Sequence, residues 1–353
     1  MKKNTTQTDT RHLLTGKRIG PPHDGYSDQP YCVVNGDGSW TCVMTHGGGH
    51  EGAPGQHVVS TRSEDGGQTW SDFAQIEPPD GPEASRAQPL RIPETGRLYA
   101  FYTYNKDNLR EVEREDGTLI GRVDSLGAYM YRYSDDMGLS WSEERYEIPM
   151  RLFRIDRENA YGGRVLFFWG VGKPFIHEGE TFVPYSKVHA FGPGFFAQNE
   201  GAIVASPNLA TEPDPAKHEW ITLPEGEEGI RAPEGAGRVS GELYVTPMND
   251  GSFFATFRTI DGYACQAYSR DRGRSWTTDW MRYSPGSRAV KNPRSANFAW
   301  RCANGKYLYW FNNHGGAPLR DACREPGGGG RAYAHRNPTF LLGGIERDGE
   351  IYW

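Results

Sequence analysis

The segment from His46 to His57 contains several residues that can exchange protons. It reads His-Gly-Gly-Gly-His-Glu-Gly-Ala-Pro-Gly-Gln-His, so His50 and Glu51 are neighbours in a glycine-rich loop. Glycine lets the backbone approach a ligand closely, and histidine and glutamate are common general acids and bases. The loop is therefore a candidate site for acid–base chemistry, with His50 or Glu51 as the proton carrier. Alternatively, His46 and His57 are strand-end residues with structural partners.

The five cysteines show no C-x-x-C spacing, and their number is odd. Zinc sites and disulfide frameworks are recognised by paired, regularly spaced cysteines. The sequence therefore indicates neither, and we expect no metal and no other cofactor. Because free cysteine is among the most buried residue types, we expect buried thiols. The cysteines are Cys32, Cys42, Cys265, Cys302 and Cys323.

The charge and the apolar runs exclude two classes of protein. The 353 residues include 39 basic and 45 acidic side chains, which gives a formal net charge of −6. This charge argues against a nucleic-acid binder that relies on bulk positive charge. No apolar run approaches the roughly 18 residues of a membrane-spanning helix, and no signal peptide is recognisable. Localisation stays open, with secretion or a periplasmic location expected if a leader was removed.

A repeated turn motif indicates the elements that must position such a loop. The pattern Ser-x-Asp-x-Gly-x-Ser/Thr-Trp occurs three times, at 63–70, 134–141 and 269–276. Serine, aspartate and glycine suit a tight turn, and the tryptophan can pack onto a sheet. The copies lie about 70 residues apart or twice that distance, so we expect a degenerate copy near Ser206. A second weak copy, from Glu346 to Trp353, closes the chain.

A second kind of turn precedes each copy of the motif. Asparagine–glycine and aspartate–glycine turns between apolar runs are strong hairpin signals. Each unit is therefore predicted to hold strand A, a turn, strand B, a variable loop, strand C, the motif and strand D. Four antiparallel strands repeated at this period predict an all-β protein, a β-propeller with five visible units. A β-sandwich with chance matches is the alternative. The turns lie at 35–38, 94–96, 178–179, 249–251 and 304–305.

The motif is the Asp box, and a chain with three clean copies resembles the sialidase (neuraminidase) superfamily over residues 25–353. This resemblance also covers a branch of sialidase-like polysaccharide lyases. It implies a ring of six or seven four-stranded blades in the complete protein, whereas five units are visible. We therefore expect residues 1–24 to be an N-terminal extension and 25–353 to be a propeller domain that is truncated at its C-terminal end.

Propeller geometry divides the loops between two faces. The A–B turns and the Asp boxes lie on one face, so we expect the B–C and D–A loops, which include the long ones, to form the binding face. Tyr161 and His189 are further candidate catalytic residues on it, and Arg231 and His314 are candidate substrate-binding residues. Cationic groups gathered there favour an anionic ligand, although each alone could be a solvated or structural charge. Other candidates are Tyr26, Trp169, Gln198, Glu200, Arg238, Lys291, Arg294 and Asn313.

The resemblance also implies specific roles. Sialidases hold a substrate carboxylate with three arginines, and Arg258 and Arg336 resemble the second and third of them. Where the first is expected, in an Arg-Ile-Pro string on the opening strand, this chain has residues 29–31, Gln-Pro-Tyr. The string at 91–93 lies on strand A of the second unit beside a turn, so we interpret it as a coincidence. The family's tyrosine nucleophile would lie near or beyond the end of this chain.

The loop from His46 to His57 resembles the sialidase loop that carries an aspartate acid/base, so His50 or Glu51 would take that role. The first hypothesis is an enzyme that cleaves an acidic glycan of the uronic or sialic type. Hydrolysis needs an acid and a nucleophile or base, whereas β-elimination needs a base beside the carboxylate and arginine to stabilise the developing charge. The second hypothesis is a non-catalytic glycan-binding or scaffold propeller. The expected partner is an acidic oligo- or polysaccharide, without nucleic acid or membrane; the oligomeric state stays open.

Overall fold

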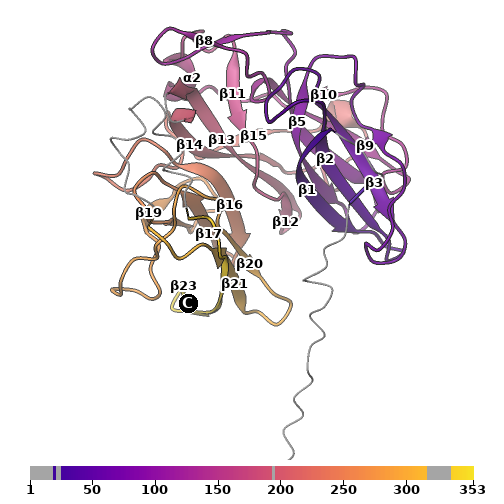
Figure 1. Cartoon of the computed structure of the whole chain (residues 1–353). Helices are drawn as coiled ribbons and strands as arrows, with labels where there is room; N and C mark the ends of the chain where they lie inside the picture. Colours follow the sequence, from indigo (N-terminus) through magenta and orange to yellow (C-terminus); the bar gives the residue numbers. More distant parts are fainter. Residues whose placement is uncertain (1–18, 21–24, 193–194, 316–334) are drawn as a thin grey trace, which may run out of the picture.

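The computed structural model describes residues 19–20, 25–192, 195–315 and 335–353, with backbone alone at 195–197. Cys323 and most of the expected N-terminal extension lie outside these residues. Within them the chain is almost entirely β-structure, with one α-helix, α2 (Arg154–Arg157), and one 3-10 helix (Pro215–Lys217) (Figure 1). No helix in this described part is long and apolar enough to cross a membrane.

The first unit shows the predicted order of strands. Its four strands lie in the order in which the chain forms them, and each pair of neighbours is antiparallel. The turn at 35–38 joins strands A and B, and the first Asp box joins strands C and D. The strands are β1 (Tyr26–Val34), β2 (Trp40–Gly47), β3 (His57–Ser63) and β4 (Ala74–Gln75).

The second and third units share one nine-stranded sheet. A short strand, β11 (Leu166–Trp169), pairs with a strand of each unit and connects them. The second unit has β5 (Ala84–Arg91), β6 (Leu98–Tyr104), β9 (Leu126–Ser134) and β10 (Tyr146–Glu147). Its B–C loop contains the small pair β7 (Val112–Glu113) and β8 (Leu119–Ile120). The third unit has β12 (Phe175–His177), β13 (Glu180–Gly192), β14 (Phe195–Ser206) and β15 (Ile221–Leu223).

The fourth and fifth units are separate four-stranded sheets. The fourth has β16 (Gly241–Pro247), β17 (Phe253–Arg258), β18 (Cys265–Ser269) and β19 (Thr277–Trp280). The fifth has β20 (Phe298–Arg301), β21 (Tyr307–Phe311), β22 (Phe340–Arg347) and β23 (Glu350–Tyr352). Five antiparallel four-stranded blades are therefore present, and the predicted all-β propeller is confirmed.

The Asp boxes fold as their residue types predict. In the first box, the Asp65 carboxylate accepts the backbone N–H groups of Gln68 and Thr69, both at 2.9 Å. Ser63 Oγ accepts the N–H of Gly67 at 2.8 Å, and Gly67 has a φ of +85° that favours glycine. The boxes at 134–141 and 269–276 repeat the serine and aspartate contacts. The motif therefore closes the C–D hairpin with polar bonds of its own.

Apolar cores between successive blades hold the units together. Blades one and two enclose Val43 and Tyr102, and blades two and three enclose Phe101. Blades three and four enclose Phe253, and blades four and five enclose Tyr309. The aromatic residues of the sequence thus fill the spaces between blades. The far face of the fifth blade differs, because Leu341 is 61% exposed there.

Strand A of the first, second and fourth blades contains the same local irregularity, which directs a side chain towards the centre of the molecule. The strand register shifts after Asp28 in β1, after Ser85 in β5 and after Gly241 in β16. Each shift contains a non-glycine residue with positive φ: Gln29 at 53°, Arg86 at 62° and Glu242 at 59°. Such β-bulges re-aim a side chain, and they are frequent next to active sites. The same β-bulge therefore occurs in strand A of three blades.

Candidate active site

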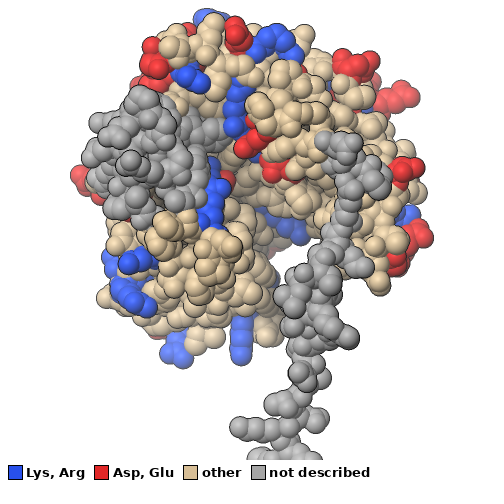
Figure 2. Space-filling view, in the orientation of Figure 1, with Lys and Arg blue, Asp and Glu red and all other residues tan. Residues whose placement is uncertain are grey.

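A cavity of about 360 Å³ lies where the blades meet. Space-filling atoms show a hollow there, with basic and acidic side chains along its walls (Figure 2). The lining comes from the starts of β1 and β16, the end of β17, the short strand β11 and the B–C loops of the first, second and fifth blades. The residues that line it are Tyr26, Asp28, Gln29, Glu51, Arg122, Trp169, Glu242, Arg258 and Arg336.

The Arg86 side chain connects the carboxylates on one side of this cavity. Its guanidinium is 2% exposed and pairs with Asp124 at 2.5 Å, Glu51 at 3.2 Å and Asp28 at 3.4 Å. It also stacks on Trp169, with 3.2 Å between the guanidinium carbon and the ring centroid. A buried guanidinium needs such paired and stacked partners to offset its lost hydration. Arg86 therefore fixes three acidic side chains that come from different segments.

Glu51 is held as a carboxylate. Burial by itself would raise its pKa, but the charges of Arg122 and Arg86 outweigh that effect, so the pKa of Glu51 lies below its ordinary value. The Arg122 guanidinium is 2.8 Å from the Glu51 carboxylate and also contacts Asp124 at 2.8 Å. Glu51 is thus ionised at neutral pH, so it has no proton to donate and can only accept one.

The pKa of Tyr26 is shifted in the opposite direction. Burial, followed by the negative charges of Asp28 and Glu51, raises the pKa of its hydroxyl well above the ordinary value. A phenol in this environment keeps its proton at neutral pH, so it carries a proton that it can donate and is not a phenolate nucleophile. The cavity therefore places a proton acceptor and a proton donor together.

Glu242 and Arg258 form an ion pair on the other side of the cavity. The Arg258 guanidinium is 2.9 Å from Glu242 Oε1, and Trp169 Nε1 donates to the same oxygen at 3.4 Å. Within the described part of the chain, Glu242 Oε2 and Arg258 Nε are buried and have no hydrogen-bond partner. Arg336, from the B–C loop of the fifth blade, also lines the cavity, and its guanidinium donates to the Arg294 carbonyl.

The sequence-predicted residues are only partly brought together. Glu51, Arg258 and Arg336 line the central cavity, together with Tyr26 and Trp169, which are among the other candidates predicted from the sequence. The three arginines of the lining, with Arg122 as the third, face three carboxylates. Cationic side chains therefore line the central cavity, and acidic side chains of the same lining balance their charge.

The other candidate catalytic residues contact backbone groups outside the lining of the cavity. The His50 ring lies 3.0 Å from the Glu51 carbonyl oxygen and is exposed. The Tyr161 hydroxyl accepts the N–H of Glu113 at 3.1 Å. His189 Nε2 lies 2.9 Å from the Glu158 carbonyl oxygen. Their catalytic roles stay predictions.

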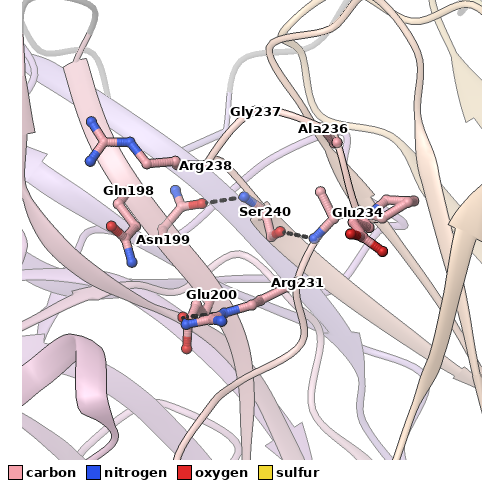
Figure 3. A pocket seen from close by; sticks show the side chains of 12 residues that line it. Gln198, Asn199, Glu200, Arg231, Glu234, Ala236, Gly237, Arg238 and Ser240 are labelled. Atoms are coloured by element: carbon pink, nitrogen blue, oxygen red, sulfur yellow. Dashed lines mark hydrogen bonds and ion pairs between the residues drawn. The ribbon is translucent and has the colours of Figure 1, made fainter.

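Arg231 belongs to a second cavity, of about 300 Å³, on the same face. Figure 3 shows it under the loop from Arg231 to Ser240, beside the start of β14. Arg231 is bound to Glu200 at 2.6 Å and to Glu228 at 2.8 Å. The remaining candidate, His314, stacks on His335 with 4.1 Å between the ring centroids. Among the described residues, no group of three metal-ligating side chains is arranged to hold an ion.

Sequence reasoning missed Asp28, Arg86, Arg122, Asp124 and Glu242. The signal for two of them was a charged residue inside a strand that is otherwise buried, in Ser-Arg-Ala-Gln for Arg86 and in Gly-Glu-Leu-Tyr for Glu242. A charge in such a place is rare unless it is paired. This pattern does not identify the partners, because they lie on other strands and loops of the same blade or, for Asp28 and Glu51, in the neighbouring blade.

Comparison with known proteins identifies the family. A family model described as a BNR repeat-like domain matches residues 86–332. The chain belongs to this BNR repeat-like family. Its fold is that of the sialidase superfamily, as the Asp boxes indicated. A search of curated protein sequences finds no match to the chain.

Solved structures share the fold of this BNR repeat-like chain at low sequence identity. A protein of unknown function from Dyadobacter fermentans is 16% identical with a TM-score of 0.58, over 84% of this chain and 77% of that one. A variant of NanB sialidase from Streptococcus pneumoniae is 13% identical with a TM-score of 0.57. The match covers 93% of this chain and 60% of that one. The intramolecular trans-sialidase from Ruminococcus gnavus is 13% identical, with a TM-score of 0.51 and coverages of 82% and 77%.

Proposed function

We propose that the protein is an enzyme that cleaves an acidic glycan in the central cavity. The observation that carries this proposal is the meeting of Arg258 and Arg336 with ionised Glu51 in one cavity. Guanidinium groups bind carboxylates through paired, charge-assisted hydrogen bonds. The substrate is therefore a glycan whose sugar carries a carboxylate, of the uronic or sialic type.

The protonation states favour β-elimination from a uronate. Glu51 removes the proton beside the sugar carboxylate, and Arg258 and Arg336 stabilise the charge that develops on that group. Tyr26 donates its proton to the oxygen that leaves, so the glycosidic bond breaks and a double bond forms in the sugar ring. An acid catalyst for hydrolysis is normally a carboxyl group with a raised pKa, and the pKa of Glu51 is shifted in the opposite direction.

A non-catalytic glycan-binding propeller is the second candidate. The pairing of Arg258 with Glu242 favours it, because a substrate carboxylate must compete with an existing partner. The presence of Gln29 near the position expected for the first arginine also weakens recognition of sialic acid in particular. Binding without cleavage would then be the function of the cavity.

A panel of polyuronates and sialosides tests these candidates. The reaction is followed both by new reducing ends and by the ultraviolet absorbance of an unsaturated uronate. We expect both signals with the wild type and a loss of about 10²-fold or more in kcat with Glu51→Gln and Tyr26→Phe. Arg258→Ala should lose activity, whereas Arg274→Ala, on the Asp-box face, should not. Reducing ends without absorbance would indicate hydrolysis, and binding without either signal would indicate the glycan-binding propeller.

A further inference from the structure

Cys32 and Cys42 face each other in the first blade. Cys32 lies on β1 and Cys42 on β2, and the register of this antiparallel pair places them directly opposite. Residues opposite each other point to the same side of a sheet. Both are free thiols in the structure. Cysteine spacing alone does not reveal the pair, because nine residues separate the two cysteines and their pairing depends on the register of the hairpin around the turn at 35–38.

The hydrogen-bond pattern of the hairpin places the two cysteines at a narrow pair. The N–H of Asn35 donates to the Ser39 carbonyl at 2.8 Å, which makes these two residues the hydrogen-bonded pair next to the turn. Hydrogen-bonded and non-hydrogen-bonded pairs alternate along an antiparallel ladder, so Cys32 and Cys42, three pairs further, form a non-hydrogen-bonded pair. The Cα atoms of such a pair are about 4.5 Å apart, within the range of about 4.4–6.8 Å that disulfides adopt.

The two thiols differ in exposure and acidity. Cys42 is fully buried beside Met44 and Val59, whereas Cys32 is partly exposed. A hydrogen bond with Cys42 lowers the pKa of Cys32, and the nearby Lys173 ammonium lowers it further. The same hydrogen bond and burial raise the pKa of Cys42. Cys32 is therefore the thiol that an external reagent meets first and that reacts as a thiolate.

We propose that Cys32 and Cys42 are a covalent modification site, at which a small-molecule disulfide such as oxidised glutathione produces a cross-strand disulfide. The Cys32 thiolate attacks one sulfur of the reagent and releases the first thiol. Cys42 loses its proton, attacks Cys32 Sγ and releases the second thiol. The cysteine pair loses two electrons and two protons, and the reagent is reduced to two thiols.

The cross-link ties β1 to β2 next to the central cavity. Tyr26, Asp28 and Gln29 all belong to β1, and the bulge at Gln29 precedes Cys32 by three residues. A covalent bond at this place fixes the register of the strand beyond the bulge. The modification therefore stabilises the segment that carries three residues of the lining.

Peptide mapping of the full chain tests the proposal. The protein is equilibrated with oxidised glutathione, quenched in acid, denatured, alkylated and digested without reduction. We expect a linked peptide pair containing Cys32 and Cys42, two hydrogens lighter than the reduced pair, while Cys265 and Cys302 are recovered alkylated. Recovery of Cys32 and Cys42 as alkylated thiols would overturn the proposal. Persistent glutathione on Cys32, or a link from Cys32 to another cysteine, would overturn it as well.

Variants separate the cross-link from other effects of oxidation. Cys32→Ser removes the partly exposed thiol, and Cys265→Ser is the matched control in the buried part of β18. The unfolding temperature of the wild type and of Cys265→Ser should rise on oxidation, and that of Cys32→Ser should not change. In Cys42→Ser, glutathione should accumulate on Cys32 because the second attack is missing. An equal rise in Cys32→Ser would contradict the cross-link.

Discussion

At the scale of single residues, Arg86 determines much of the organisation of the cavity. It lies on a buried strand, yet it contacts Asp28, Glu51 and Asp124, which belong to a first strand and to two B–C loops. An arginine inside an apolar strand can be noticed in the sequence. Its partners cannot be identified there, because up to 58 positions separate them from it and only the packing of two blades brings them together.

Removal of Arg86 is expected to destabilise the protein strongly. Arg86→Met leaves Asp124 buried with one guanidinium fewer, and breaking a buried ion pair in this way costs about 3–5 kcal/mol. Chemical denaturation measures the change in the free energy of unfolding. Arg91→Met, at the end of the same strand, is the control and should stay within about 0.5 kcal/mol. Equal losses of unfolding free energy in Arg86→Met and Arg91→Met would show that Arg86 does not stabilise the buried carboxylates.

The fall of activity at low pH should follow the protonation of Glu51. If Glu51 is the base, activity falls as the pH decreases through its pKa, which lies below the ordinary value of about 4.3. Arg122→Gln removes a positive charge 2.8 Å from this carboxylate, so the pKa of Glu51 rises and the fall in kcat/KM moves to higher pH. Arg97→Gln, on the Asp-box face, should leave the profile unchanged. An unchanged profile in Arg122→Gln would exclude Glu51 as the titrating base.

At the scale of elements, the sequence predicts the hairpins well and the loops poorly. The Asp boxes and the A–B turns contain their own hydrogen-bond partners, so their structure follows from a few neighbouring residues. The B–C loops depend on contacts with other blades. Thus His50 and Glu51 are adjacent in sequence, but only Glu51 meets Arg86 and Arg122 and lines the cavity.

The Asp boxes should contribute to unfolding in acid. Hydrogen bonds from Thr69 lower the pKa of Asp65 to about 2, and the pKa values of Asp136 and Asp271 are lowered as well. A lowered folded-state pKa gives stability that is present above the unfolded value of about 3.9 and lost as the pH falls through the folded value.

Replacing the three aspartates by asparagine tests this contribution. The variant Asp65→Asn, Asp136→Asn, Asp271→Asn should be less stable at neutral pH, and its unfolding temperature should depend less on pH between about 4 and about 2. The three single effects should add, because the boxes lie in separate units. Parallel pH curves for the variant and the wild type would contradict the prediction.

At the scale of the whole molecule, the aromatic cores between blades are the main source of cohesion. The abundance of aromatic residues and the repeat predicted blades, but the sequence does not show which aromatic residues face a neighbouring blade. Phe101 and Leu341 are both large apolar residues on strands, and only the first is buried between two blades. The position of each strand relative to the neighbouring blades decides the difference.

Two substitutions measure this difference. Phe101→Ala opens a space in the core between the second and third blades and should cost about 3–5 kcal/mol. Leu341→Ala, at a side chain that is 61% exposed, should change stability by no more than about 0.5 kcal/mol. Denaturant unfolding of both variants gives the comparison. A large loss in Leu341→Ala would mean that this face is covered in solution.

The bulges in the first strands have a consequence for the evolution and redesign of the cavity. At Gln29, Arg86 and Glu242, the bulged main chain sets the direction of the side chain. Gln29 and Glu242 belong to none of the aromatic cores between blades. Glu242, however, is the partner of the buried Arg258 guanidinium, so its replacement would also break that ion pair. Ligand preference can therefore diverge by single substitutions at Gln29, and a small library at that position is a route to new specificities.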